Sequence, residues 1–85
     1  MTKVTVYSTD YCPYCVSAKR LLAARGIAFE EINVEGDDEK RRWLIQATGQ
    51  RTVPQIFFGE RSIGGFQELA GLDRTVGLAK ALAEA

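Results

Sequence analysis

The sequence contains no histidine, although histidine is the residue most often used as a metal ligand and as a general base near neutral pH. Its absence excludes a Cys–His catalytic dyad and a Cys₂His₂ zinc site within this chain. Neither sign of charge is in excess, because 11 basic and 11 acidic residues give a formal net charge of +0. This balance does not favour nucleic acid as a partner.

The sequence also lacks an apolar run long enough to be a signal peptide or a membrane span. We therefore expect no membrane partner and a cytoplasmic location, unless an upstream leader has been removed. A chain of 85 residues has room for one hydrophobic core, so we expect a single domain over residues 1–85.

Cysteine is scarce, and the two cysteines present, Cys12 and Cys15, are separated only by Pro13 and Tyr14. An alternating strand over residues 3–7 precedes them, and Pro13 fits the first turn of a helix. The unpaired N–H groups at a helix start stabilise a thiolate and lower the pKa of its thiol. In the cytosol a disulfide is more often catalytic than structural.

This context predicts a redox-active pair in which Cys12 attacks a disulfide and Cys15 resolves the mixed disulfide that results. Two alternatives use the same residues. The cysteines could be inert buried thiols, or they could be half of a zinc site that a second chain completes.

The pattern of the whole chain predicts the element order β-α-β-α-β-β-α. Strands are expected over 3–7, 27–34, 55–58 and 61–63, and helices from Pro13 to Gly26, over 39–48 and over 66–83, the last interrupted at Gly71 and Gly77. A helix joins the first two strands, which makes them parallel, whereas a two-residue turn makes the last two antiparallel. A mixed sheet with helices on both faces follows.

Two short motifs each allow a functional and a structural interpretation. Pro54, in Thr52-Val53-Pro54, fits a strand entrance as a trans proline, and the residue chemistry by itself favours this form. A cis peptide would instead turn the Val53 backbone toward the cysteine loop, where it could pair with an extended peptide. Gly64-Gly65 before Phe66 is either a tight turn or a pocket of backbone N–H groups for a carboxylate.

Taken together, these residues resemble the dithiol class of glutaredoxins. The resemblance covers nearly the whole chain and rests on Cys12-Pro13-Tyr14-Cys15, Thr52-Val53-Pro54, Gly64-Gly65 and the chain length. It implies a thioredoxin-like, three-layer α/β/α fold. The four-stranded mixed sheet would have the order 4-3-1-2 with strand three antiparallel, and Pro54 would be cis.

The resemblance further implies an enzyme, a glutathione-dependent thiol–disulfide oxidoreductase acting in electron transport and cell redox homeostasis. Its substrates would be protein disulfides and glutathione mixed disulfides. Glutathione would be a co-substrate and a partner, with no permanently bound cofactor and no metal. The protein would act as a monomer.

Outside the cysteine pair, the implied glutathione-binding residues are Tyr14, Arg41, Thr52, Val53, Pro54, Gly65, Phe66 and Gln67. Tyr14 would flank the tripeptide, and Val53 would pair with its cysteinyl backbone. The amides of Phe66 and Gln67 would hold the γ-glutamyl carboxylate. Arg41, which by itself would be read as a solvated helix residue, would meet the glycyl carboxylate beside Thr52.

The chain departs from the family pattern at two places. Asp10 stands where family members often carry a lysine or arginine, and it would raise the pKa of Cys12 if the two were close. Phe66-Gln67-Glu68 stands where many members have a small residue or cysteine followed by two acids.

Two alternative functions remain. A glutaredoxin-like electron donor to ribonucleotide reductase, served by thioredoxin reductase, would suit the missing basic residue. An iron–sulfur-binding dimer would use Cys12 as a ligand, and Pro13 and Tyr14 argue against it.

Overall fold

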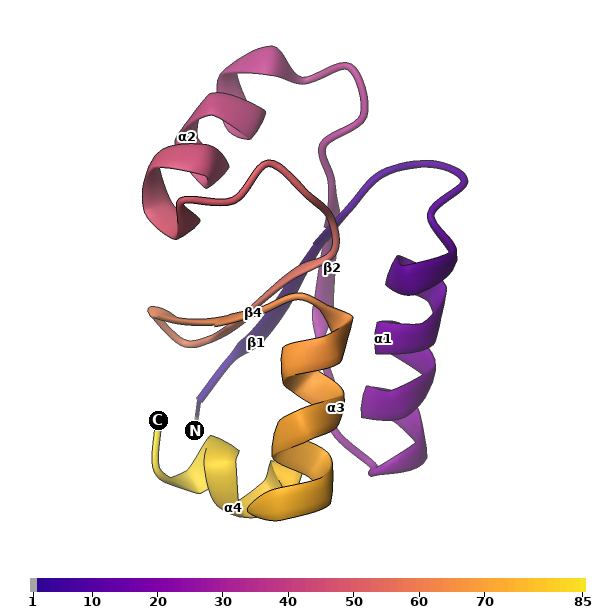
Figure 1. Cartoon of the computed structure of the whole chain (residues 1–85), viewed down its shortest axis with the longest axis vertical. Coiled ribbons are helices and arrows are strands. Elements are labelled where there is room, and N and C mark those ends of the chain that lie inside the picture. The colour runs from indigo at the N-terminus through magenta and orange to yellow at the C-terminus, as the bar shows by residue number, and fades with distance from the viewer. Residues whose placement is uncertain (1) are drawn as a thin grey trace.

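Four short strands form one mixed sheet in the computed structural model, which describes residues 2–85 (Figure 1). The strands lie in the order β2-β1-β3-β4. The elements, in chain order, are β1 (Val4–Ser8), α1 (Pro13–Ala24), β2 (Glu30–Asn33), α2 (Asp38–Thr48), β3 (Gln55–Phe58), β4 (Arg61–Gly64), α3 (Phe66–Thr75) and α4 (Leu78–Ala83).

Strand directions follow from how the strands are connected. β1 and β2 are parallel because α1 carries the chain back between them, and β3 and β4 are antiparallel because only two residues join them. β3 is also antiparallel to β1. Read from the other edge, this is the predicted order 4-3-1-2 with strand three antiparallel, so the predicted sheet is confirmed.

One face of the sheet carries the main hydrophobic core. Successive side chains of a strand point to opposite faces, so Val4 and Val6 are buried on this face while Thr5 and Tyr7 point away. Helices α1, α3 and α4 cover it, and Figure 1 shows α1 and α3 side by side. The buried cluster consists of Val4, Val6, Ala18, Leu22, Ile56, Phe58, Leu69, Leu78 and Ala81.

The opposite face carries an aromatic cluster on which α2 packs. The rings of Tyr7 and Phe57 lie 5.6 Å apart, and Trp43 of α2 lies 5.6 Å from Tyr7 and 6.1 Å from Phe57. Burial raises the pKa of Tyr7, and the negative charge of Glu30 adds to the effect. The cluster fixes α2 above the sheet although Trp43 itself is half exposed.

Two details of the predicted secondary structure are wrong. The strand predicted over 27–34 is limited to β2, because the N–H of Ile27 still donates to the carbonyl oxygen of Leu22 (3.0 Å) at the end of α1. The predicted interruption at Gly71 does not occur, since one glycine lowers helix stability by only about 1 kcal/mol. The break lies at Gly77, where φ is +89°.

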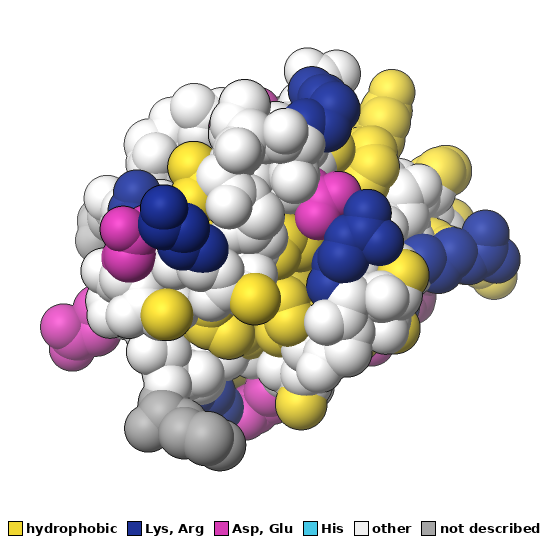
Figure 2. Space-filling model, turned by 90° about the horizontal axis from the view of Figure 1, so that it is seen from below, with side chains coloured by type: hydrophobic (Ala, Val, Ile, Leu, Met, Phe, Trp, Pro, Cys, Tyr) yellow, Lys and Arg dark blue, Asp and Glu magenta, His cyan; other side chains and the backbone are white. Residues whose placement is uncertain are grey.

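The surface on the α4 side carries both signs of charge among hydrophobic side chains (Figure 2). One ion pair joins two helices, since Arg25 at the end of α1 contacts Asp73 of α3 at 2.8 Å. In residues 2–85, no helix has the length and apolar character needed to cross a membrane.

Candidate active site

The two cysteines form a disulfide at the start of α1. Cys12 is the N-cap residue, Pro13 is the first helical residue, and the two Cα atoms lie 5.2 Å apart. The backbone N–H of Cys15 donates to the Sγ of Cys12 at 3.1 Å. Cys15 is buried, with 2% exposed, whereas Cys12 is only partly covered. Cys12 is therefore the sulfur that an incoming thiol or disulfide can reach.

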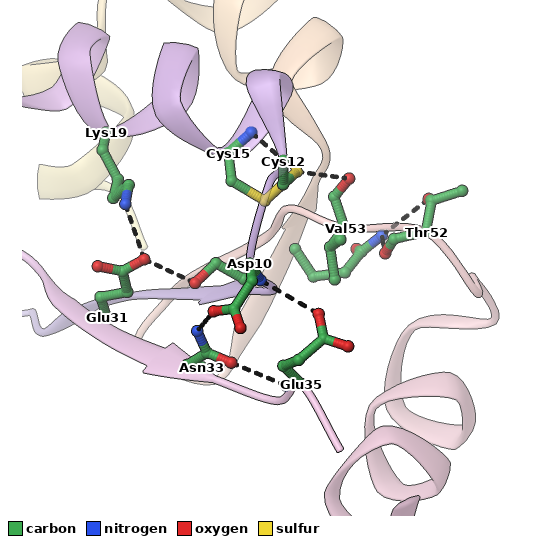
Figure 3. Close-up of a disulfide and its surroundings, with 11 residues drawn as sticks. Asp10, Cys12, Cys15, Lys19, Glu31, Asn33, Glu35, Thr52 and Val53 are labelled. Carbon is green, nitrogen blue, oxygen red and sulfur yellow. Dashed lines mark hydrogen bonds and ion pairs between the residues drawn. A yellow bond between two sulfur atoms is a disulfide. The ribbon is translucent and has the colours of Figure 1, made fainter. Parts of the chain in front are cut away.

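The loop before β3 lies against this disulfide. The Val53–Pro54 peptide is cis, which confirms the form that the resemblance implies. The carbonyl oxygen of Val53 lies 3.8 Å from the Sγ of Cys12, as Figure 3 shows. Because a disulfide sulfur carries no proton, this approach of the two atoms is a van der Waals contact and not a hydrogen bond. It places the Val53 backbone beside the exposed sulfur.

A groove of about 320 Å³ runs beside the cysteine pair, at the lower end of the range of ligand pockets, about 300–1,000 Å³. It brings together residues of α1, the loop before β3 and the start of α3. Its lining consists of Tyr14, Thr52, Val53, Pro54, Gly65, Phe66, Gln67 and Glu68. Seven of these are residues for which the sequence predicts glutathione binding.

Arg41, the remaining predicted residue, lines a smaller neighbouring pocket. Thr52 and Val53 line both pockets, so Arg41 of α2 lies next to the groove without forming part of its lining. Arg51 lines the same smaller pocket. Two arginine residues, Arg41 and Arg51, therefore lie beside the part of the groove that Thr52 and Val53 line.

The start of α3 forms one wall of the groove. Gly65 is the N-cap residue, and its backbone N–H donates to the Oε1 of Glu68 at 2.7 Å. Gly64 has φ +113°, a backbone conformation that residues other than glycine rarely adopt. The ring of Phe66 stacks on Tyr14 at 6.4 Å, which joins this wall to α1.

Asp10 takes part in a hydrogen-bond network with Asn33 and Glu35. Its Oδ1 accepts a hydrogen bond of 2.9 Å from the Nδ2 of Asn33, and its N–H donates to the Oε1 of Glu35 at 3.2 Å. The N–H of Glu35 donates in turn to the Oδ1 of Asn33 at 2.8 Å. The two bonds of Asp10 tie the loop before α1 to the end of β2 and the loop after it, and the third bond orders that loop (Figure 3).

Behind the cysteines lies a second polar network that the sequence analysis does not predict. The hydroxyl of Ser8, which is fully buried, donates to the Oε2 of Glu31 at 2.6 Å. Lys19 contacts the same oxygen at 2.8 Å. The hydrogen bonds from Lys19 and Ser8 lower the pKa of Glu31.

Gln55 is a further residue that sequence reasoning misses. Its side chain is 1% exposed, and its Nε2 donates to the carbonyl oxygen of Thr52 at 2.9 Å. This bond holds the loop that forms the groove. The Gln55–Thr52 bond spans only three residues and depends on the turn at Pro54, whereas the Ser8–Glu31 bond forms only when separate elements pack.

A family model described as "Glutaredoxin" matches residues 4–63 of the chain. Glutaredoxin 3 of Escherichia coli K12 is 42% identical over 78 residues, which cover 92% of this chain and 94% of that protein. A glutaredoxin of Neisseria meningitidis serogroup A is 47% identical over 79 residues, covering 92% and 93% of the two chains.

Solved structures agree with this similarity. The crystal structure of a buckwheat glutaredoxin–glutathione complex is similar, with a TM-score of 0.88 and 33% identity. The match covers 98% of this chain and 78% of that one. The predicted thioredoxin-like arrangement of a four-stranded mixed sheet with flanking helices is thereby confirmed.

Proposed function

The chain belongs to the glutaredoxin family of glutathione-dependent thiol–disulfide oxidoreductases, and we propose that Cys12 and Cys15 are its catalytic pair. One observation carries the proposal. The more accessible sulfur, that of Cys12, lies at the N-cap of α1 and at the edge of a peptide-sized groove.

Cys12 is the nucleophile. Its thiolate attacks the glutathione sulfur of a mixed disulfide, so a bond forms between these two sulfurs and the substrate leaves as a thiolate that takes up a proton. A second glutathione thiolate then attacks the glutathionyl sulfur. Glutathione disulfide leaves, and the Cys12 thiolate is restored. The N–H of Cys15 and the start of α1 stabilise that thiolate.

Cys15 resolves substrates that are themselves dithiols. After Cys12 has formed a mixed disulfide with one substrate sulfur, the Cys15 thiolate attacks the Sγ of Cys12. The Cys12–Cys15 disulfide forms and the substrate leaves with both sulfurs reduced. Two molecules of glutathione then reduce the enzyme and become glutathione disulfide.

Glutathione occupies the groove in an extended conformation. The backbone of Val53 pairs with the cysteinyl residue of the tripeptide, beside Tyr14 and next to Pro54. The backbone amides of Phe66 and Gln67, after Gly65, hold the γ-glutamyl carboxylate at the start of α3, where the helix dipole favours an anion.

Arg41 binds the glycyl carboxylate at the other end of the tripeptide, and Thr52 lines the groove there. The guanidinium group supplies a charge-assisted hydrogen bond to a carboxylate. Thr52 and Val53 line both the groove and the smaller pocket of Arg41, so Arg41 lies next to the groove, which supports this assignment.

We further propose that the protein acts in the cytoplasm as a monomer made of one domain, residues 1–85. The partners are glutathione and disulfide-containing or glutathionylated proteins, and glutathione is a co-substrate rather than a bound cofactor. Support comes from the cysteine pair and the groove, which one chain supplies, and from bacterial relatives matched over nearly their full length.

The test is a coupled assay with glutathione, glutathione reductase, NADPH and the mixed disulfide of glutathione and mercaptoethanol. We expect NADPH oxidation well above the rate with glutathione alone, and we expect Cys12→Ser to return it to that background. Replacing glutathione and its reductase by thioredoxin reductase should give no turnover. Turnover only with thioredoxin reductase would assign the protein to the ribonucleotide reductase pathway instead.

A further inference from the structure

Packing explains neither the backbone conformation of Tyr11 nor the exposure of its side chain. Among residues 2–85 it is the one residue other than glycine with positive φ, at +54°. Aromatic residues avoid this region because the Cβ approaches the following carbonyl group. Its side chain is also fully exposed, with a relative exposure of 102%. Strained residues of this kind cluster at functional sites.

The loop that carries Tyr11 is built to present it. Asp10, its neighbour, bonds through both its N–H and its carboxylate to Glu35 and Asn33, which lie after and at the end of β2. On the other side Cys12 caps α1 and is joined to Cys15. The ring is therefore held outward by a loop anchored at both ends, directly next to the reactive sulfur.

Within residues 2–85, two carboxylates without an ion-pair partner belong to the loop of Tyr11 or bond to it. In the part of the chain from residue 2 onward, the ion pairs use Glu30, Glu31 and Asp73, and none uses Asp10 or Glu35. The bond from the Asp10 N–H to Glu35 brings the two acids together. The loop thus combines an exposed aromatic ring with unneutralised negative charge.

This loop lies outside the glutathione groove. None of Asp10, Tyr11 and Glu35 belongs to the groove lining, and Asp10 and Val53 approach the disulfide from different directions (Figure 3). When the glutathione half of a mixed disulfide occupies the groove, the polypeptide half is bonded to the glutathione sulfur, which Cys12 attacks from the side opposite the bond that breaks. The polypeptide half therefore lies outside the groove and extends over the neighbouring surface.

We propose that Asp10, Tyr11 and Glu35 form a docking surface for the polypeptide half of a glutathionylated substrate, with a preference for cysteines flanked by lysine or arginine. The inference rests on the proposed function. A cation fits because it can lie on the face of the Tyr11 ring while the two carboxylates attract it. A second copy of this chain does not fit, since four carboxylates would then face one another.

The test compares two synthetic peptides of equal length, each with one glutathionylated cysteine. Arginines flank the cysteine in one peptide and glutamates flank it in the other. In the coupled glutathione reductase assay at low salt, we expect kcat/KM to be about tenfold higher for the arginine peptide, from exposed charge pairs and one cation–π contact. High salt should reduce this ratio, because it screens exposed charges.

Three variants assign the preference to residues. Tyr11→Asn removes the ring but tolerates positive φ, so the loop keeps its conformation, and we expect the peptide ratio to fall about threefold. Tyr11→Phe should keep the ratio. The double variant D10N/E35Q, which keeps the ring, should lower the ratio to about threefold. Val76→Asn at the end of α3 is the matched control, since it also removes an exposed apolar side chain, and it should not alter the ratio.

The outcomes separate this proposal from the proposed function. A wild-type enzyme that reduces the mercaptoethanol mixed disulfide but shows no peptide preference overturns the docking surface alone. Equal ratios in the wild type, Tyr11→Asn and D10N/E35Q overturn it as well. If no glutathionylated substrate is reduced, the proposed function fails, and the docking surface fails with it.

Discussion

The backbone N–H of Cys15 donates a 3.1 Å hydrogen bond to the Sγ of Cys12, so the buried residue of the pair also supports the more exposed sulfur. This bond comes from the backbone and survives substitution of the Cys15 side chain. We therefore expect the two cysteines to have separable roles, one in attack and one in resolution.

Cysteine substitutions should separate these roles. We expect Cys12→Ser to abolish turnover of every substrate, because the nucleophile is lost. Cys15→Ser should retain deglutathionylation, which needs only Cys12 and glutathione, and should lose reduction of a dithiol substrate. Parallel assays with a glutathionylated peptide and a protein disulfide measure both activities. Loss of both activities in Cys15→Ser alone would contradict the assignment.

Gly64→Ala should damage the α3 wall of the groove. An added Cβ would lie 2.7 Å from the Oε1 of Glu68, at a residue with φ +113°. We expect a loss of about 1–3 kcal/mol in the free energy of unfolding, together with a higher KM for glutathione. Urea denaturation and steady-state kinetics measure the two effects.

Gly71→Ala is the matched control, since α3 continues through Gly71 and no atom lies within 4 Å of the position of its Cβ. It should raise stability by about 0.5–1 kcal/mol through helix propensity. Equal effects of Gly64→Ala and Gly71→Ala would show that the contact with Glu68 is unimportant.

Arg41→Ala should weaken glutathione binding without removing chemistry. We expect KM for glutathione to rise about three- to tenfold with little change in kcat, because an ion pair at a partly exposed rim is lost. Arg42→Ala is the matched control. Arg42 is the exposed neighbour of Arg41 on α2, and it lines neither pocket. A similar KM in both variants would remove Arg41 from the site.

The Ser8–Glu31–Lys19 network should make stability depend on pH. The folded-state pKa of Glu31 is lowered, so its contribution is present above the ordinary value of 4.5 and is lost as pH falls through the folded value. Because the Glu31 side chain is 37% exposed, we expect Glu31→Gln to cost only about 0.5–1 kcal/mol at neutral pH.

Urea denaturation of the wild type and Glu31→Gln at pH 7 and at about pH 3 measures this dependence, and the difference should become smaller at the lower pH. Glu60→Gln, in the exposed β3–β4 turn, is the control. A difference between the wild type and Glu31→Gln that stays constant with pH would mean that the substitution acts through packing rather than charge.

Local pattern was sufficient for most of the elements. β3 begins and ends at the predicted residues because Pro54 cannot belong to the ladder and Gly59 turns the chain after it. The start of β2 was harder to predict, since Ile27 and Phe29 look like strand residues but lie before β2 and pack against the core. Tertiary contacts overrode propensity there.

At the site, the sequence identified the residues that short motifs carry, and it missed those that act through distant partners. Asp10 illustrates the limit. The sequence predicts an effect of its charge on Cys12, and it does not predict the bonds to Asn33 and Glu35 that anchor the loop carrying Tyr11. Nothing in the chain order pairs Asp10 with residues of the loop after β2.

The sequence by itself determined the redox chemistry, because two cysteines at a helix start need only local geometry to approach one another and to share the N–H groups of the first turn. It also determined the directions of the joined strands, through the lengths and types of the connections, whereas the sheet order was predicted from the family resemblance. Only the tertiary structure decided where the groove lies, what anchors its walls and which side of Cys12 remains open. The walls of the groove come from residues far apart in the chain, such as Tyr14 and Phe66, and the contact between their rings exists only after α1 and α3 have packed.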